Sequence, residues 1–251
     1  MESASKLIKQ SCELYQKHFG LIIGYTAWLL LPYAGIVLFS LPKSNAFLEI
    51  FSFVFSIIQG FLALWLGILI PLLIRELINS KTKIPLLSLQ NKAWQLISSV
   101  VFVAILETAV VLGGFILLII PAFIFWVWFA MAQFSVILEN KKGLEAMAYS
   151  RELSRHKFWP LTWRLIAGPA FFSVILMLAV GLLISVVAAI FGFSVESLLG
   201  PTPPLWAELI SMVIETFSIP LFLIYYTLLY LDLTQIKNPS STTSSNPIQN
   251  P

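Results

Sequence analysis

Six long runs of mostly apolar residues without Lys or Arg recur along this chain, with short polar segments between them. A helix needs about 20 such residues to cross a hydrocarbon core of roughly 30 Å. The pattern therefore predicts six transmembrane helices, at residues 19–41, 50–74, 96–119, 121–138, 165–191 and 205–231. The third and fourth runs adjoin, and we expect Pro121 to lie in the first turn of a new helix there, where proline is well tolerated.

The polar segments carry the charge of the protein in a strongly biased way. Fourteen of the 15 Lys and Arg residues fall in the N-terminal segment, in the second-to-third and fourth-to-fifth connections and in the C-terminal tail, and Lys43 alone falls on the opposite side. Short loops rich in Lys and Arg stay in the cytoplasm. The pattern thus predicts a multi-pass protein of the cell membrane with both termini in the cytoplasm.

Three polar segments, at 3–18, 84–95 and 143–158, have helical periodicity and each precedes a pair of spans. The first and third share a frame, in which Ser11, Glu13, Leu14 and Phe19 correspond to Ser150, Glu152, Leu153 and Phe158. The second keeps only an aromatic residue, Trp94, in the place of Tyr15. The fold expected is all-α, with three hairpins of transmembrane helices, each preceded by a cytoplasmic amphipathic helix at the interface.

This arrangement gives a single transmembrane domain over residues 1–236. Residues 237–251 are rich in Ser, Thr, Asn and Pro and are expected to form a disordered cytoplasmic tail. The lipid bilayer is then the main partner, and anionic headgroups at the cytoplasmic face favour basic amphipathic helices. The candidate headgroup contacts are Lys141, Lys142, Arg151, Arg155 and Lys157.

An acidic residue stands at the end of each even-numbered span, namely Glu76, Glu139 and Asp232. One hypothesis is that these carboxylates accept hydrogen bonds or salt bridges from the amphipathic segments and fix the hairpins in place. The other interpretation is ordinary charge in solvated loops.

The composition supports the membrane assignment and includes few residues of the types that catalysis commonly uses. The chain is 59% hydrophobic and 11% charged, with a mean hydropathy of +0.91, against about 25% charged residues in soluble domains. One cysteine, two histidines and no catalytic or metal-binding motif predict a non-enzymatic protein without a cofactor or metal. The net charge of +3 reflects the cytoplasmic loops, so nucleic acid is not expected as a partner.

Two acidic residues fall inside the predicted spans, Glu107 in the third and Glu215 in the sixth, and Gln59 lies in the second. A charged carboxylate in the membrane is costly, so each is expected to face the bundle interior. No Lys or Arg lies within a predicted span, which argues against a fixed internal ion pair. The three residues either line a transport pathway or join helices as hydrogen-bonded neutral groups.

Residues 117–160 carry a resemblance to a known family. An Ile-Ile-Pro turn leads into an aromatic helix, and Gly143, Glu145, Ser150 and the pair Phe158 and Trp159 follow. This stretch resembles the membrane domain attached to some bacterial glycerophosphoryl diester phosphodiesterases and its stand-alone relatives. In those enzymes a separate soluble barrel carries the chemistry, and this chain has no residues left to form one. The resemblance implies a six-helix bundle with an accessory, scaffolding or lipid-handling role.

Two functions remain open from the sequence. The first is a membrane scaffold that binds lipid or a membrane or cytoplasmic protein partner through its basic segments. The second is a transporter or permease for a small solute or lipid that uses Glu107 and Glu215. Convergence of these glutamates and Gln59 on one polar cavity would favour transport.

Overall fold

The computed structural model describes residues 2–40, 46–79, 84–155, 157–193 and 204–237, and these are helical almost throughout. The elements are α1 Ala4–Lys17, α2 Phe19–Thr26, the 3₁₀ helix η1 Ala27–Leu29, α3 Leu30–Ser40, α4 Ala46–Asn79, α5 Leu86–Leu117, α6 Ile119–Phe129, α7 Ala132–Glu139, α8 Gly143–Arg155, α9 Phe158–Phe191 and α11 Leu205–Lys237. The described residues contain no strand, which confirms the all-helical prediction. The first residue of the predicted tail, Lys237, ends α11, and Lys43 and residues 238–251 lie outside the described residues.

Six helical stretches are long and apolar enough to cross a membrane, as the sequence predicted. They are Phe19–Phe39, Phe47–Asn79, Leu86–Ile116, Ile119–Glu139, Phe158–Phe191 and Leu205–Gln235. Large apolar side chains on them are exposed, for example Ile116 at 88% and Met177 at 78%. A water-soluble protein rarely leaves so much apolar surface uncovered. Six such helices are consistent with a multi-pass membrane protein.

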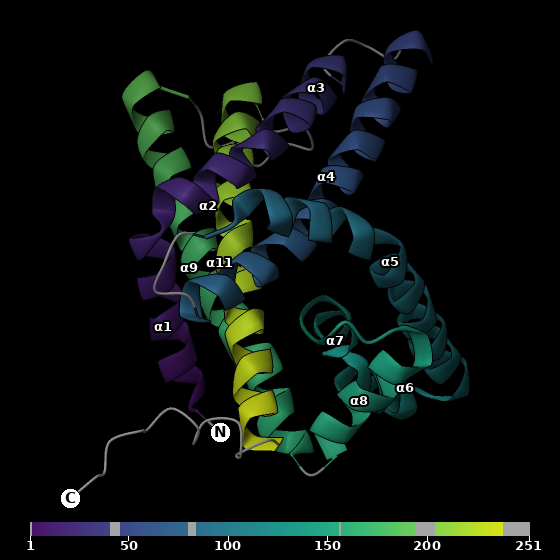
Figure 1. The fold of residues 1–251 in the computed structure, drawn as a ribbon. Coiled ribbons are helices and arrows are strands. Elements are labelled where there is room, and N and C mark those ends of the chain that lie inside the picture. Colours follow the sequence, from purple (N-terminus) through teal and green to yellow (C-terminus); the bar gives the residue numbers. More distant parts are fainter. Residues whose placement is uncertain (1, 41–45, 80–83, 156, 194–203, 238–251) are drawn as a thin grey trace, which may run out of the picture.

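The long helices α9 and α11 run side by side through the middle of the molecule, and α1 lies along them at the end that holds the N-terminus (Figure 1). Helices α3 and α4 pack against each other, and so do α5 and α6, with α7 and α8 close by. The fully buried side chains include Leu7 of α1, Ile70 of α4, Val136 of α7 and Tyr230 of α11. The buried core therefore extends from α1 through α11 and α4 to α7, which pack in that order.

The fourth span is broken, although the sequence predicted one helix over 121–138. Helix α6 ends at Phe129 and α7 begins at Ala132. The Ser150 hydroxyl of α8 donates to the Trp128 carbonyl over 2.7 Å and accepts from the Met131 N–H over 3.2 Å. An irregular backbone is tolerated in a membrane only where protein groups satisfy it, and α8 provides them. Pro121 lies in the first turn of α6, as predicted.

The helices of the first and third polar segments begin at equivalent positions. Helices α1 and α8 begin 139 residues apart, and so do α2 and α9, which start at Phe19 and Phe158. The buried serines Ser11 and Ser150 occupy the same position in both units. The second segment differs, because residues 86–95 continue without a break into the third span as part of α5. Its backbone therefore lacks the turn that separates α1 from α2.

Helices α9 and α11 approach closely at one glycine. A Cβ atom built on Gly168 would lie 2.1 Å from the Tyr225 ring, so only glycine fits there without movement of the ring. Tyr225 is fully buried, and its hydroxyl donates to the Arg164 carbonyl over 2.7 Å. Small residues permit such close helix contacts in membrane proteins, and this contact fixes the start of α9 against α11.

Candidate functional site

Helix α8 presents two of the predicted headgroup contacts on its outer surface. Ala146, Met147 and Leu153 are buried against the bundle, which leaves Arg151 and Arg155 exposed. The Arg151 guanidinium stacks over the Trp128 ring at 4.5 Å from its centroid, a cation–π arrangement that holds the charge in place. These side chains, with Ala148 and Glu152, line a hollow of about 370 Å³.

The other three predicted contacts lie in different surroundings. Lys141 pairs with Glu145 at 2.7 Å and lies over the Tyr149 ring at 4.7 Å. Lys142 is exposed beside a second hollow of about 320 Å³, which Phe102 also lines. Lys157 is half-buried and precedes α9. The structure therefore brings Arg151 and Arg155 together at one hollow and places the three lysines elsewhere.

Exposed tryptophans begin the neighbouring helix α9. Trp159 and Trp163 are 73% and 68% exposed. Tryptophan is enriched where a membrane meets water, because its ring is apolar and its N–H can bond to water or headgroups. The first turns of α9 thus add an aromatic surface close in sequence to the basic residues of α8.

The polar residues of the predicted intramembrane site have different neighbours. Glu107 of α5 accepts a hydrogen bond from the Gln133 amide of α7 over 3.2 Å. Glu215 is exposed on α11 and lies near Tyr33 of α3. The buried Oε1 atom of Gln59 on α4 has no hydrogen-bond partner within the described part of the chain. No hydrogen bond between described residues joins any two of Glu107, Glu215 and Gln59.

The expectation that the spans contain no basic residue is wrong, because Arg75, Lys92 and Arg164 all lie within the six candidate membrane-spanning helices. Helix α9 begins at Phe158, seven residues before the predicted start of the fifth span, so Arg164 lies inside it. Its side chain is 10% exposed, and its Nη1 lies 3.5 Å from Oδ2 of Asp232, which is 12% exposed. The sequence contains one signal for the earlier start, because Pro160 fits the first turn of a helix.

Asp232 also binds the N-terminal segment. The backbone N–H of Glu2, which precedes α1, donates to both carboxylate oxygens of Asp232 at 3.2 and 3.1 Å. Asp232 therefore accepts the kind of hydrogen bond that the hypothesis expects from an amphipathic segment, and its role in fixing the hairpin stays a prediction. Arg164 is the second partner of this carboxylate, and no local sequence pattern indicates it, because the two residues lie on different helices.

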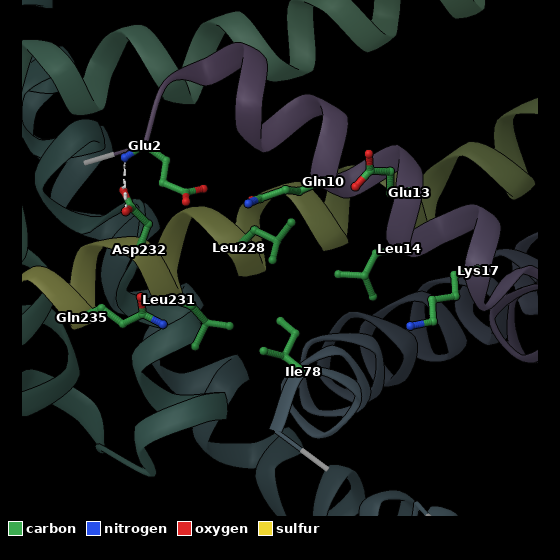
Figure 2. Close-up of a pocket in the computed structure, with 10 residues that line it drawn as sticks. All are labelled: Glu2, Gln10, Glu13, Leu14, Lys17, Ile78, Leu228, Leu231, Asp232 and Gln235. Atoms are coloured by element: carbon green, nitrogen blue, oxygen red, sulfur yellow. Dashed lines mark hydrogen bonds between the residues drawn. The ribbon is translucent and has the colours of Figure 1, made fainter. Parts of the chain in front are cut away.

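A cavity of about 380 Å³ lies next to this ion pair, between α1, α11 and the end of α4. Figure 2 shows the side chains that line it. They are Glu2, Gln10, Glu13, Leu14, Lys17, Ile78, Leu228, Leu231, Asp232 and Gln235. Asp232 thus connects the buried ion pair with a cavity whose wall is partly polar and partly aliphatic.

Two further observations bear on the chemistry of the protein. Within the described ranges, no three His, Cys, Asp or Glu side chains come close enough to hold a metal ion. Comparison with models of known protein families, with curated proteins and with solved structures gives no match for this chain.

Proposed function

We propose that this chain is a non-enzymatic protein of the cell membrane with both termini in the cytoplasm. Its six spans form three hairpins, and polar amphipathic segments at the cytoplasmic interface precede them. The segregation of Lys and Arg supports this orientation. The positions of α1 and α8 support the interfacial assignment, since each directly precedes a transmembrane helix and exposes basic side chains such as Lys9 and Arg151.

The proposed role is that of a scaffold or binding module that gathers anionic lipid at its cytoplasmic face. The observation that carries it is the pair Arg151 and Arg155 around the hollow that Trp128 lines. A guanidinium forks onto a phosphate with two parallel hydrogen bonds. A basic residue close to an anionic membrane surface contributes about 1 kcal/mol. The same surface is open to an acidic segment of a membrane or cytoplasmic protein partner.

A lipid-binding scaffold is the kind of role that the resemblance to the phosphodiesterase membrane domain implies. The proposal includes that this chain is a stand-alone relative of that domain. A transporter that uses Glu107 and Glu215 is the alternative function. No observation favours it, because the two glutamates have different neighbours and Glu215 is exposed. The three cavities described for this structure are lined by other residues.

The test is lipid selectivity of the purified protein in nanodiscs that contain phosphatidylcholine and a minor share of phosphatidylglycerol. The variant is Arg151→Gln with Arg155→Gln. The control is Lys9→Gln with Lys92→Gln, which removes two exposed charges on other helices. Enrichment of phosphatidylglycerol around the protein is measured by mass spectrometry of the bound lipid.

We expect the double arginine variant to bind phosphatidylglycerol about 30-fold more weakly, because two contacts of about 1 kcal/mol each are lost. The lysine control should retain most of the selectivity. Equal loss in both variants would show a diffuse charge effect and contradict a site on α8. No selectivity in the unmodified protein would contradict the lipid-binding role altogether.

A further inference from the structure

The cavity between α1, α11 and α4 is separate from the α8 surface and has a different kind of lining. Its volume of about 380 Å³ falls in the usual range of small-molecule sites, about 300–1,000 Å³. Ten residues from three helices and the segment before α1 surround it. It therefore offers enough space for a compact ligand or for part of a lipid.

Aliphatic side chains form one continuous part of the wall. Leu14 of α1, Ile78 of α4, and Leu228 and Leu231 of α11 point into the same space, as Figure 2 shows. An acyl chain would bury apolar surface against them, at about 25 cal/mol per Å². The polar residues lie around this aliphatic part, so the wall as a whole suits an amphiphile.

The carboxylates of the wall already have cationic partners. Glu2 pairs with Lys6 at 2.5 Å, and Glu13 pairs more loosely with Lys9 at 3.9 Å. Asp232 faces Arg164 at 3.5 Å. The negative charges that line the cavity are thus largely compensated from outside it.

Lys17, the cationic residue of the wall, has no carboxylate partner of this kind among the described residues. Among the residues that the structure describes, it forms no ion pair, and Figure 2 shows its ammonium end turned toward the cavity. The amides of Gln10 and Gln235 also lie on the wall and can donate hydrogen bonds. The free charge that the cavity offers to a ligand is therefore positive.

We propose that this cavity binds a single-chain anionic amphiphile, with its phosphate or carboxylate at Lys17 and its acyl chain over Leu14, Leu228 and Leu231. A lysophospholipid and a free fatty acid both present this chemistry. The site does not depend on the proposed role of α8, since it shares no lining residue with that surface.

The experiment titrates the whole protein in a non-ionic detergent with four probes and counts bound molecules by native mass spectrometry. The probes are lysophosphatidylglycerol, oleate, zwitterionic lysophosphatidylcholine and a cationic alkylammonium of similar chain length. The variants are Lys17→Gln, which removes the free charge, and Leu231→Trp, which fills the cavity. Lys92→Gln serves as the control, because its side chain is exposed on α5 and lines no part of this cavity. Thermal unfolding confirms that each variant is folded.

We expect one tightly bound anionic probe per protein and about tenfold weaker binding to Lys17→Gln, the value of one charge-assisted contact. Leu231→Trp should abolish binding, and Lys92→Gln should leave it unchanged. Binding of lysophosphatidylglycerol alone would identify a phosphate ligand, and binding of oleate alone a carboxylate. Preference for the zwitterionic or cationic probe, or identical binding to Lys17→Gln and the unmodified protein, would overturn the proposal.

Discussion

The buried pair of Arg164 and Asp232 makes the sharpest prediction about stability. Asp232 neutralises a guanidinium that is only 10% exposed, and its two oxygens share one bifurcated hydrogen bond from the Glu2 N–H. Asp232→Asn keeps a side-chain acceptor for that N–H and removes the negative charge. The variant thus leaves Arg164 inside the helix bundle without its counter-ion.

The expected cost follows from the separation of the charges. At 3.5 Å, two unit charges attract by about 5 kcal/mol if the effective dielectric constant is about 20. Desolvation offsets much of this attraction, and removal of one partner from a buried pair costs about 3–5 kcal/mol. Because both side chains retain slight exposure, we expect Asp232→Asn to lower the free energy of unfolding by about 3 kcal/mol.

The assay is reversible unfolding in detergent of the unmodified protein, both single variants and the double variant. Arg164→Met should cost a similar amount, because it leaves Asp232 unpaired. The double variant should lie within about 1 kcal/mol of the unmodified protein, since no unpaired charge remains. A double variant that loses the sum of both single effects would refute the pairing, as would an Asp232→Asn variant of unchanged stability.

Three further predictions follow from other contacts. Gly168→Ala should lower the free energy of unfolding by about 1–3 kcal/mol, because its Cβ would clash with the Tyr225 ring. Thermal unfolding in detergent compares it with Gly181→Ala on the same helix, which should not destabilise the protein, because a Cβ there has no atom within 4 Å. Ser150→Ala should cost about 1–3 kcal/mol in the same assay, because it removes the partner of the Met131 N–H and leaves the Trp128 carbonyl with only the longer 3.5 Å hydrogen bond from the Ser154 hydroxyl. An unchanged midpoint would contradict this. Cys12 should react with a membrane-impermeant maleimide only from the cytoplasmic side, and labelling from outside would contradict the orientation. The reaction should become faster as the pH rises, because burial and a neighbouring carboxylate raise the pKa of the Cys12 thiol.

The six spans could be predicted from the sequence, because each is marked by a run of consecutive apolar residues. About 20 consecutive apolar residues make a span wherever they occur, and Pro121 correctly separated the third span from the fourth. The residue frame shared by the first and third polar segments is likewise local, and the helices α1 and α8 begin at equivalent positions in it, Ala4 and Gly143. These features depend on residues close together in the chain.

The remaining features depend on contacts between distant residues. The break between α6 and α7 requires the hydroxyl of Ser150, which is 19 residues from Met131. A span defined as an apolar run without basic residues leaves out Arg164, whose counter-ion lies on another helix. No local pattern could show that Arg151 and Arg155 share a hollow with Trp128 while the neighbouring lysines do not.

The central claim is that anionic headgroups bind at the exposed basic surface of α8. Photo-crosslinking tests it most directly, with phosphatidylglycerol that carries a diazirine in its headgroup, in nanodiscs made mainly of phosphatidylcholine. We predict that cross-linked peptides concentrate in residues 143–155 and around Trp128, and that a phosphatidylcholine probe does not label them preferentially. Equal labelling of these peptides by both probes, or labelling confined to other segments, would contradict the account.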